Sequence, residues 1–193
     1  MFLDKLCKTN PNLIQTAVYM HQQKQIMPDT YVVDVDQFLE NAKAILQKAN
    51  EQNIELYYML KQIGRNPYLA KELEKLGYKG AVVVDFKEAE VMMKNHLHIS
   101  HAGHLVQIPS MMINQLIAYG CDYITVYSYE KLVEVNEAAK KIGLVQKVCV
   151  RVIGENDRIY SGQTAGFYLN QLEELVQKSK DLKYIEIAGV DNF

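Results

Sequence analysis

Short apolar segments of strand length alternate with amphipathic helical segments from Tyr31 to the end of this 193-residue chain. Parallel strands need a long crossover between them, and a helix is its usual form, so the alternation predicts a parallel sheet covered by helices. The predicted strands are residues 31–34, 56–61, 81–85, 98–102, 123–127, 147–153 and 184–190.

The chain contains no linker and no low-complexity tract, so we expect one domain spanning residues 1–193. Within it, residues 1–27 are predicted to form helices, with Pro11 at the break between two of them. Residues 31–193 are predicted to form the alternating units. Three glycines are expected to end helices just before strands, namely Gly77, Gly120 and Gly143.

The first turn from strand to helix favours a barrel over a doubly wound sheet. This turn, Asp34-Val35-Asp36, lacks the glycines that hold a phosphate in dinucleotide-binding sheets. A closed eight-unit barrel usually needs about 250 residues, and the pattern here ends on its seventh strand. The predicted fold class is therefore α/β, a TIM-barrel-like parallel array that is incomplete.

Composition limits the classes of function. Hydrophobic residues make up 49 % and charged residues 23 %, as in soluble globular proteins, and the net charge of −2 argues against a nucleic-acid-binding surface. No apolar run approaches the roughly 20 residues that span a membrane, and the first residues lack the layout of a signal peptide. We expect a cytoplasmic location and three reduced, buried thiols without a metal, at Cys7, Cys121 and Cys149.

Lys61 ends the predicted strand 56–61, at the end where barrel enzymes keep their reactive groups. Alternation along the strand puts it on the face of Tyr57 and Met59. An ammonium held against apolar walls loses hydration, and the neutral amine then serves as a base or forms a Schiff base with an aldehyde. The alternative, which spacing alone favours, is a lysine that leaves the strand and reaches solvent.

Four histidines lie within nine positions, at His96, His98, His101 and His104. Imidazole is the commonest metal ligand, so a zinc or iron site deserves consideration. Strand geometry places His96 and His98 on one face and His101 on the other, and no acidic residue accompanies them at a ligand spacing, so a metal site is the less favoured interpretation. His104 lies in the turn after a strand, where it can approach a bound cofactor.

Arg65 immediately precedes an Asn-Pro helix start, where free amides and a guanidinium together can hold a carboxylate or a phosphate. A surface arginine beside a capping turn explains the sequence equally well. Asp85 ends a predicted strand and, with Glu88, also matches a capping box. Residues 157–163 form a polar, glycine-containing loop after a strand and are a candidate wall of the site.

Several short motifs occur together in this chain. They are Lys61-Gln62, Gly64-Arg65-Asn66-Pro67, the run Gly103-His104-Leu105-Val106-Gln107-Ile108-Pro109, and Gly162-Gln163 with Gly166-Phe167. In combination they resemble the fold-type III pyridoxal-phosphate enzymes of the alanine racemase N-terminal-domain superfamily, and in particular the YhfX-like proteins. The resemblance covers essentially the whole chain.

The resemblance carries implications for the site. In that superfamily, a lysine at the end of the first barrel strand forms an internal aldimine with pyridoxal 5′-phosphate, and the match falls on Lys61. Residues 31–34 would lie outside the barrel, leaving six barrel strands, without the later phosphate-binding loops and the β-domain that helps complete a dimeric site. Asn192 stands where racemases often have a histidine stacked on the cofactor, and an amide does not titrate near neutral pH. Lys61 is therefore the candidate catalytic residue, and the candidate cofactor-binding residues are Lys61, Arg65, His104 and Asn192.

The leading functional prediction is a pyridoxal-phosphate-dependent amino-acid racemase, an isomerase that acts on a small-molecule amino acid. The alternatives are a non-catalytic cofactor-binding or regulatory barrel and, less favoured, a metal-dependent hydrolase that uses the histidine cluster. Six barrel strands would leave apolar edges at residues 56–61 and 184–190, so we expect a homodimer. Cofactor binding is expected to be weaker than in full-length relatives.

Overall fold

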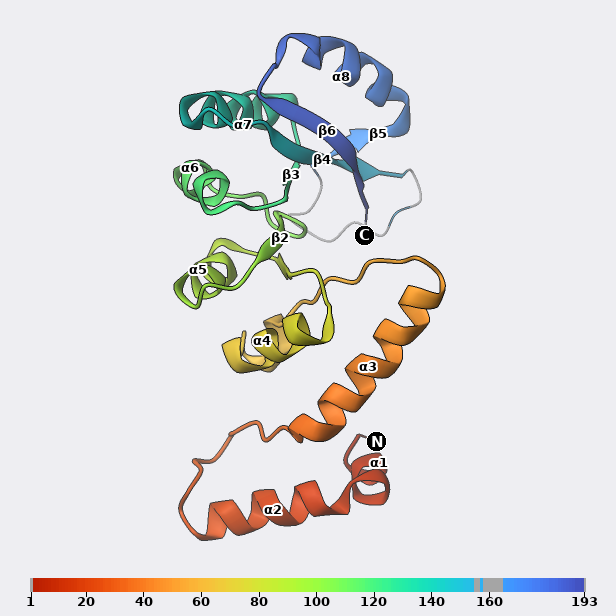
Figure 1. The fold of residues 1–193 in the computed structure, drawn as a ribbon, viewed down its shortest axis with the longest axis vertical. Coiled ribbons are helices and arrows are strands. Elements are labelled where there is room, and N and C mark those ends of the chain that lie inside the picture. The colour runs from red at the N-terminus through yellow and green to blue at the C-terminus, as the bar shows by residue number, and fades with distance from the viewer. Residues whose placement is uncertain (1, 155–156, 158–164, 193) are drawn as a thin grey trace. The chain divides into compact units, whose positions relative to one another are not determined.

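The computed structural model describes residues 2–154, 157 and 165–192 (Figure 1). The chain forms two compact units, Met1–Ile54 and Glu55–Phe193. All four candidate site residues belong to the second unit. No helix among the described residues is long and apolar enough to cross a lipid bilayer.

The first unit is helical, as the sequence predicts for residues 1–27. Its second helix begins at Pro11, where the missing amide hydrogen costs no hydrogen bond and the fixed φ suits the first helical turn. Asn10 caps this helix, because its side chain accepts a hydrogen bond from the Leu13 amide at 3.1 Å. The helices are α1 (Phe2–Thr9), α2 (Pro11–Gln22) and α3 (Val35–Glu51).

The predicted strand at residues 31–34 is wrong. The segment is irregular, and its last residue, Asp34, is the cap of α3. The Asp34 carboxylate accepts hydrogen bonds from the Gln37 amide at 3.0 Å and from the Asn10 side chain at 2.6 Å. The apolar residues thus lead into a helix instead of a strand. Asp34 begins this helix because its side chain binds an amide that has no partner within the helix.

The second unit is built on a parallel sheet. Neighbours follow the order β1, β2, β3, β4, and β6 pairs with β4. The short β5 pairs with the last two residues of β4. Every pair is parallel. The strands are β1 (Ala81–Val83), β2 (Ile99–Ala102), β3 (Tyr123–Val126), β4 (Gln146–Ile153), β5 (Phe167–Tyr168) and β6 (Ile185–Asp191).

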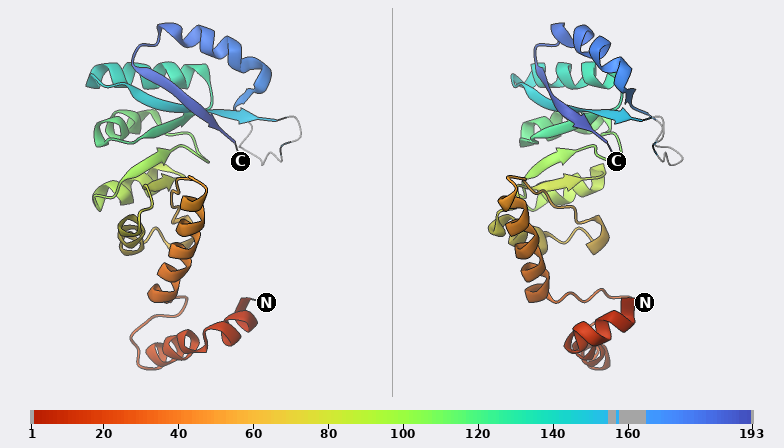
Figure 2. Two further views of the ribbon diagram at one scale, coloured as in Figure 1. Left: turned by 45° about the vertical axis from the view of Figure 1, so that its right-hand side comes forward. Right: turned by 90° about the vertical axis from the view of Figure 1, so that its right-hand side faces the viewer.

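Helices connect these strands, and α5, α6 and α7 are stacked along one face of the sheet (Figures 1 and 2). A doubly wound sheet would carry helices on both faces, so this arrangement supports the barrel-like prediction. The helices are α4 (Pro67–Leu76), α5 (Phe86–Lys94), α6 (Ser110–Tyr119), α7 (Tyr129–Ile142) and α8 (Leu172–Lys178), with 3-10 turns η1 (Lys61–Ile63), η2 (Leu169–Gln171) and η3 (Ser179–Asp181).

The predicted strand at residues 56–61 is reduced to a single bridge. Tyr58 pairs in parallel with Ala81, and its carbonyl accepts a hydrogen bond from the Val82 amide at 2.8 Å. The backbone then turns into η1 at Lys61. The bridge nevertheless keeps the predicted order, so the Tyr58 segment, β1, β2, β3, β4 and β6 are six neighbouring parallel segments of one sheet. Among the described residues, no pairing between the Tyr58 segment and β6 closes this sheet into a barrel.

The core lies between the sheet and its helices. The three glycines predicted to end helices do so with positive φ, which glycine adopts without steric penalty. Cys121 is buried and Cys149 is half-buried, whereas Cys7 is exposed on the short helix α1, so the expectation of three buried thiols is wrong for Cys7. Fully buried apolar side chains include Leu69, Ile99, Ile113, Leu116, Ile124 and Leu132.

Candidate functional site

Lys61 lies at the carboxyl end of the bridging segment, as the sequence predicts. A tight turn follows, in which the amides of Ile63 and Arg65 both donate to the Leu60 carbonyl, at 3.1 and 3.0 Å. Gly64 adopts φ 70° and Arg65 φ 55°, so two successive residues of the turn have a left-handed backbone conformation. The Lys61 side chain is exposed. The part of the chain that the structure describes therefore does not enclose Lys61 in the expected apolar walls, because the chain leaves the sheet before this residue.

Arg65 contacts the next strand end. Its Nη2 lies 3.2 Å from Asp85 Oδ2, and both side chains are about one-third exposed. Asp85 is also the cap of α5, since its Oδ1 accepts from the Glu88 amide at 2.8 Å. Asn66 caps α4 by accepting from the amides of its first turn. The guanidinium is thus held in place by a carboxylate beside the turn that carries Lys61.

Glu88 completes a modified capping box. Its Oε2 accepts a hydrogen bond from the Val84 amide at 2.8 Å, one residue before the cap residue Asp85. The side chain is fully buried, and this burial raises the pKa of the Glu88 carboxyl despite the Val84 hydrogen bond and the nearby charges of Arg65 and Lys61. The prediction that Asp85 caps a helix is therefore confirmed. Its acidic partner Glu88 binds the Val84 amide instead of the Asp85 amide that a capping box would use.

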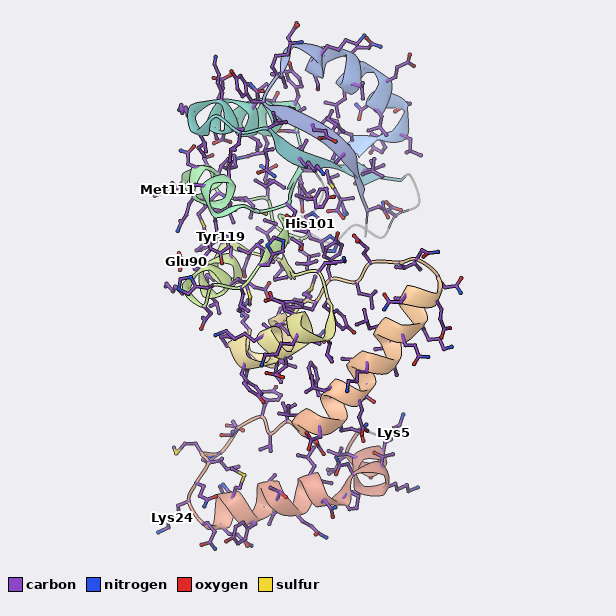
Figure 3. The ribbon with its side chains drawn as sticks, viewed as in Figure 1. Lys5, Lys24, Glu90, His101, Met111 and Tyr119 are labelled. Carbon is purple, nitrogen blue, oxygen red and sulfur yellow. The ribbon has the colours of Figure 1, made fainter. Side chains whose placement is uncertain are left out.

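The polar cluster of the sheet interior joins four side chains from three parts of the sheet. His104 Nδ1 lies 3.0 Å from Asp191 Oδ1 and 3.3 Å from Asp191 Oδ2. Thr125 Oγ1 donates to Asp191 Oδ2 at 3.1 Å, and His101 Nε2 lies 2.5 Å from Thr125 Oγ1. The two imidazole rings are 5.8 Å apart, edge to face. His101, which is labelled in Figure 3, lies among the strands.

Burial and hydrogen bonding compete at Asp191. Burial by itself raises the pKa of this carboxyl, but hydrogen bonds from His104 and Thr125 and the charges of His104 and His101 hold it below the usual aspartate value. These contacts therefore stabilise the fold above that usual value, and the stabilisation is lost as the pH falls through the lowered pKa. Burial lowers the pKa of His101, which favours its neutral form.

The turn that carries His104 is clamped by Tyr127. The Tyr127 hydroxyl lies 2.9 Å from the carbonyl oxygens of both Gly103 and His104, and donates to them. Burial raises the pKa of Tyr127 to about 12, so the hydroxyl keeps its proton. Gly103 itself has φ 90°, and a Cβ there would lie 2.9 Å from the Thr125 carbonyl oxygen. The position of His104 is thus set by β3 as well as by its own loop.

The four histidines do not gather in space. His96 is exposed in a left-handed turn, and His98 Nε2 pairs with Asp122 Oδ2 at 2.6 Å before the strands begin. His101 and His104 belong to the cluster around Asp191. Among residues 2–154, 157 and 165–192, no group of three or more His, Cys, Asp or Glu side chains is arranged so that it could hold a metal ion.

Asn192 is tied to the end of β4. Its Nδ2 donates to the Val152 carbonyl at 3.0 Å and to Asp157 Oδ2 at 2.9 Å, and the same Asp157 oxygen accepts from the Gly154 amide at 2.7 Å. These contacts hold the amide at the carboxyl ends of β4 and β6. The predicted wall at residues 157–163 lies outside the described residues except for Asp157.

Arg151, Thr125 and Asp191 were missed as site residues. Arg151 is buried on β4 and is the Cα partner of Asp191 on β6. A signal was available, because an arginine in an apolar strand, at alternate positions with Lys147 and Cys149, indicates a polar interior face. No comparable signal marks Thr125, whose contacts are 24 and 66 residues away in sequence.

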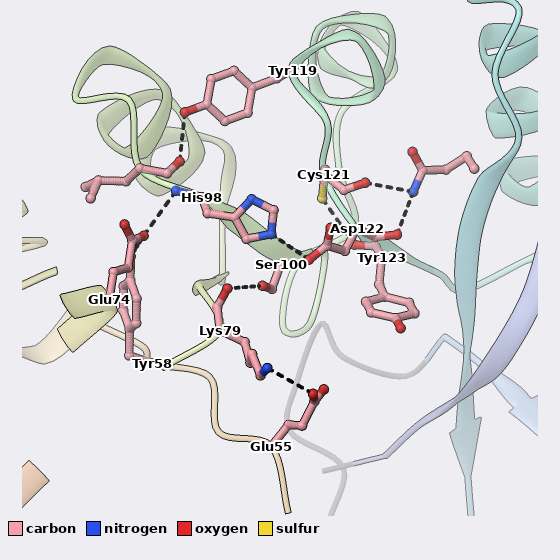
Figure 4. Close-up of polar contacts among 12 residues, drawn as sticks. Glu55, Tyr58, Glu74, Lys79, His98, Ser100, Tyr119, Cys121, Asp122 and Tyr123 are labelled. Carbon is pink, nitrogen blue, oxygen red and sulfur yellow. Dashed lines mark hydrogen bonds and ion pairs between the residues drawn. The ribbon is translucent and has the colours of Figure 1, made fainter. Parts of the chain in front are cut away.

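A cavity of about 510 Å³ opens at the amino-terminal ends of the strands, opposite the end that holds Lys61 and His104. Its lining includes the residues just before β1, β2 and β3, among them His98 and Asp122. A second ion pair there joins Lys79 Nζ and Glu55 Oε1 at 3.2 Å (Figure 4). Barrel enzymes react at the carboxyl ends, so we interpret this cavity as the unfilled interior of an incomplete barrel.

Comparison with known families and proteins adds a relationship by sequence. The family model described as alanine racemase, N-terminal domain, matches residues 33–192. The protein YhfX of Escherichia coli (strain K12) is 45 % identical over 193 residues, which is 100 % of this chain and 50 % of that protein. The chain thus spans about half the length of this curated relative.

Comparison with solved structures concerns the fold. Diaminopimelate decarboxylase from Helicobacter pylori, complexed with L-lysine, superimposes with a TM-score of 0.71 at 18 % identity, covering 90 % of this chain and 46 % of that chain. D-threonine aldolase from Filomicrobium marinum gives 0.66 at 18 %, covering 82 % and 42 %. Alanine racemase from Clostridium difficile 630 gives 0.59 at 22 %, covering 81 % and 39 %. With the open parallel sheet, these likenesses confirm the incomplete TIM-barrel-like fold.

Proposed function

Because this chain belongs to the alanine racemase N-terminal domain family, we propose that it binds pyridoxal 5′-phosphate through Lys61 and acts on an amino acid as a racemase. The observation that carries the proposal is the placement of Lys61. Lys61 is exposed at the carboxyl end of the first parallel segment, and the turn that follows it carries Arg65, which pairs with Asp85 at the end of the next strand. An accessible amine at this end is what an aldehyde cofactor requires.

The surrounding donor set fits an anionic aldehyde. Lys61 supplies the amine, Arg65 and Arg151 supply guanidinium groups, and His104 supplies an imidazole. Guanidinium groups suit phosphate and phenolate oxygens because they combine positive charge with several fixed donors. When bound, pyridoxal phosphate draws electrons from the substrate α-carbon and so makes its proton removable.

The chain's own groups then have separate tasks. The Lys61 amine would hold the cofactor through its aldehyde group. Arg65, whose guanidinium is held by its ion pair with Asp85, would bind a carboxylate or a phosphate beside Lys61. Asn192 offers an amide at the ends of β4 and β6 that hydrogen-bonds but does not carry a proton.

A second candidate is a cofactor-binding barrel without turnover. It makes the same demand on Lys61 as the racemase and differs only in the outcome of an activity assay.

The test combines spectroscopy with an activity panel. The purified chain is mixed with pyridoxal 5′-phosphate, and its visible absorbance is recorded before and after borohydride. Chiral chromatography then follows an amino-acid panel, and released carbon dioxide is measured in parallel. We expect a borohydride-sensitive band together with racemisation. A band without any reaction would favour the cofactor-binding barrel, a band with decarboxylation would replace the racemase by a decarboxylase, and the absence of a band would overturn the proposal.

We further propose that the chain forms a homodimer through its open sheet edge. Among the described residues, β6 is paired along its length with β4 alone. Its Val190 side chain is 59 % exposed. Unpaired amides beside apolar side chains favour pairing with another strand. A second copy is the commonest partner for such an edge.

Replacing Val190 by lysine is expected to shift the chain from dimer to monomer, because a charge on an edge strand opposes strand pairing. Light scattering coupled to size-exclusion chromatography at several dilutions gives the measurement. The matched control is Val176→Lys on α8, where the valine is 48 % exposed but lies on a helix. A wild-type chain that stays monomeric at every concentration would contradict the dimer.

A further inference from the structure

One oxygen of the buried Glu88 carboxyl group lacks a hydrogen-bond donor among the described residues. Glu88 is 1 % exposed, and its Oε2 accepts a hydrogen bond from the Val84 amide at 2.8 Å. Its Oε1 is the oxygen without a donor in this part of the chain. A buried carboxylate with a single hydrogen bond is costly, because each oxygen needs donors to replace water. A proton on Oε1 removes the charge and therefore most of this cost.

The same carboxyl group belongs to a charged cluster around Arg65. Asp85 joins the two residues, since its Oδ2 lies 3.2 Å from Arg65 Nη2 and its Oδ1 accepts from the Glu88 amide at 2.8 Å. Arg65 Nε is also buried, and no residue that the structure describes accepts a hydrogen bond from it. The charged groups that act on the Glu88 carboxyl are Arg65, Asp85 and Lys61. We call these four residues the Arg65 cluster.

Protonation of Glu88 changes the charge balance of the Arg65 cluster. With both carboxyl groups ionised, the positive charges of Lys61 and Arg65 are matched by two negative charges. With Glu88 protonated, the same two positive charges are opposed by Asp85 alone. The Arg65 side chain is 32 % exposed, so an anion can reach it from solvent. Such an anion is attracted more strongly when Glu88 carries a proton, because an ionised Glu88 repels it and competes for the guanidinium.

We propose that Glu88 makes the Arg65 cluster a proton-coupled oxyanion site, in which a phosphate or carboxylate binds at Arg65 together with uptake of a proton on Glu88 Oε1. The proton comes from water, and no covalent bond to carbon or phosphorus changes. This inference rests on the anion-binding role that the proposed function gives to Arg65, and it adds Glu88 as the residue that sets the affinity. Glu88 does not touch the anion in this scheme and acts through its charge.

The surroundings of Glu88 act on its proton in the required direction. Burial raises the pKa of the Glu88 carboxyl, and the charge of Asp85 raises it further. The Val84 hydrogen bond and the cations Arg65 and Lys61 lower this pKa but do not cancel the effect of burial. An anion at Arg65 offsets the guanidinium charge and so raises the pKa again. The anion affinity is therefore highest at low pH and falls between the pKa of the free protein and the higher pKa of the anion-bound protein.

Carbon-13 spectra of glutamate-labelled, cofactor-free protein measure the Glu88 proton directly. The titration runs between about pH 4 and 8, with and without sulfate, an oxyanion whose own charge is constant over this range. We expect sulfate to raise the midpoint of the Glu88 signal, and the sulfate affinity to fall about 5-fold or more as the pH rises, the usual size of a coupling between two sites. Each tenfold fall in affinity must match one pH unit between the two midpoints.

Trifluoroacetate, a carboxylate that also stays ionised, is titrated in parallel. The anion that moves the Glu88 midpoint further identifies whether Arg65 holds a phosphate-like group or a carboxylate. Arg65→Gln should abolish the effect of both anions on the Glu88 midpoint, because it removes the cation for which the anion and Glu88 compete. An effect of equal size in Arg65→Gln would place the anion elsewhere and overturn the site.

Glu88→Gln keeps the shape of the side chain and imitates its protonated form. It should bind sulfate at every pH with the affinity that the wild-type chain shows at low pH, and the loss of its signal assigns Glu88 in the spectra. The matched control is Glu90→Gln on the same helix, labelled in Figure 3, whose carboxylate is 46 % exposed and lies 3.7 Å from Lys94 Nζ. This control should titrate and bind as the wild-type chain does. If Glu88→Gln does not fold by circular dichroism, the two wild-type midpoints decide.

Two results would contradict the proton coupling. They are a Glu88 midpoint that sulfate leaves unchanged, and a pH-dependent sulfate affinity that persists in Glu88→Gln. Both are measured without pyridoxal phosphate, so they are independent of the proposed function. A borohydride-sensitive band without proton-coupled sulfate binding would remove this inference alone, whereas proton-coupled sulfate binding without the band would remove the proposed function and leave the oxyanion site.

Discussion

Replacing Lys61 by alanine is expected to remove the borohydride-sensitive absorbance completely, since a methyl group cannot condense with an aldehyde. Lys61→Arg should give the same result, because a guanidinium keeps the charge but supplies no nucleophilic amine. Thermal unfolding with and without cofactor provides a second measurement. At a cofactor concentration 100 times the dissociation constant, binding stabilises a protein by about 2.7 kcal/mol, and this increment should shrink in both variants.

The control for this prediction is Lys79→Ala. Lys79 is also exposed, but it precedes β1 at the opposite end of the sheet and pairs with Glu55. Its removal should leave the absorbance intact. A band that survives Lys61→Ala but disappears with Lys79→Ala would move the cofactor to the amino-terminal cavity and contradict the assignment of Lys61.

The second large effect is expected from Gly103→Ala in the turn before His104. Gly103 has φ 90°, and an added Cβ would lie 2.9 Å from the backbone oxygen of Thr125, which cannot move without disturbing β3. A left-handed alanine costs about 1–2 kcal/mol, and overpacking adds about 1–3 kcal/mol. We therefore expect Gly103→Ala to lower the free energy of unfolding by about 2–5 kcal/mol.

Gly120→Ala separates the two contributions. Gly120 has φ 94°, nearly the same as Gly103, but nothing lies within 4 Å of a Cβ added there. In this variant, the free energy of unfolding should fall only by the cost of the left-handed backbone, about 1–2 kcal/mol. Urea denaturation of both variants gives the comparison. Equal losses would show that the Thr125 contact is absent in solution, and with it the close packing that places His104.

Local signals in the sequence were sufficient for the order of the second unit. Apolar runs separated by segments of helical periodicity imply parallel strands. The helix caps at Asn66 and Asp85 could be predicted because each side chain accepts a hydrogen bond from a backbone amide only two or three residues further on. Residues 31–34 and 56–61 were misread as strands because an apolar run is compatible with a strand whether or not a partner is present. The two-residue β5 was missed because so short a segment has no periodicity.

The sequence by itself determined that Lys61 and Arg65 follow one parallel segment and that His104 follows another, at the same edge of the sheet, since parallel strands bring their carboxyl ends to one edge. Only the tertiary structure decided that His104 meets Asp191, 87 residues away, with Thr125 between His101 and that carboxylate. It also decided that Lys61 is exposed and that Arg65 pairs with Asp85. Side-chain partners across a sheet depend on strand register and burial, which no local pattern encodes, whereas helix periods and caps are set by neighbours a few residues apart.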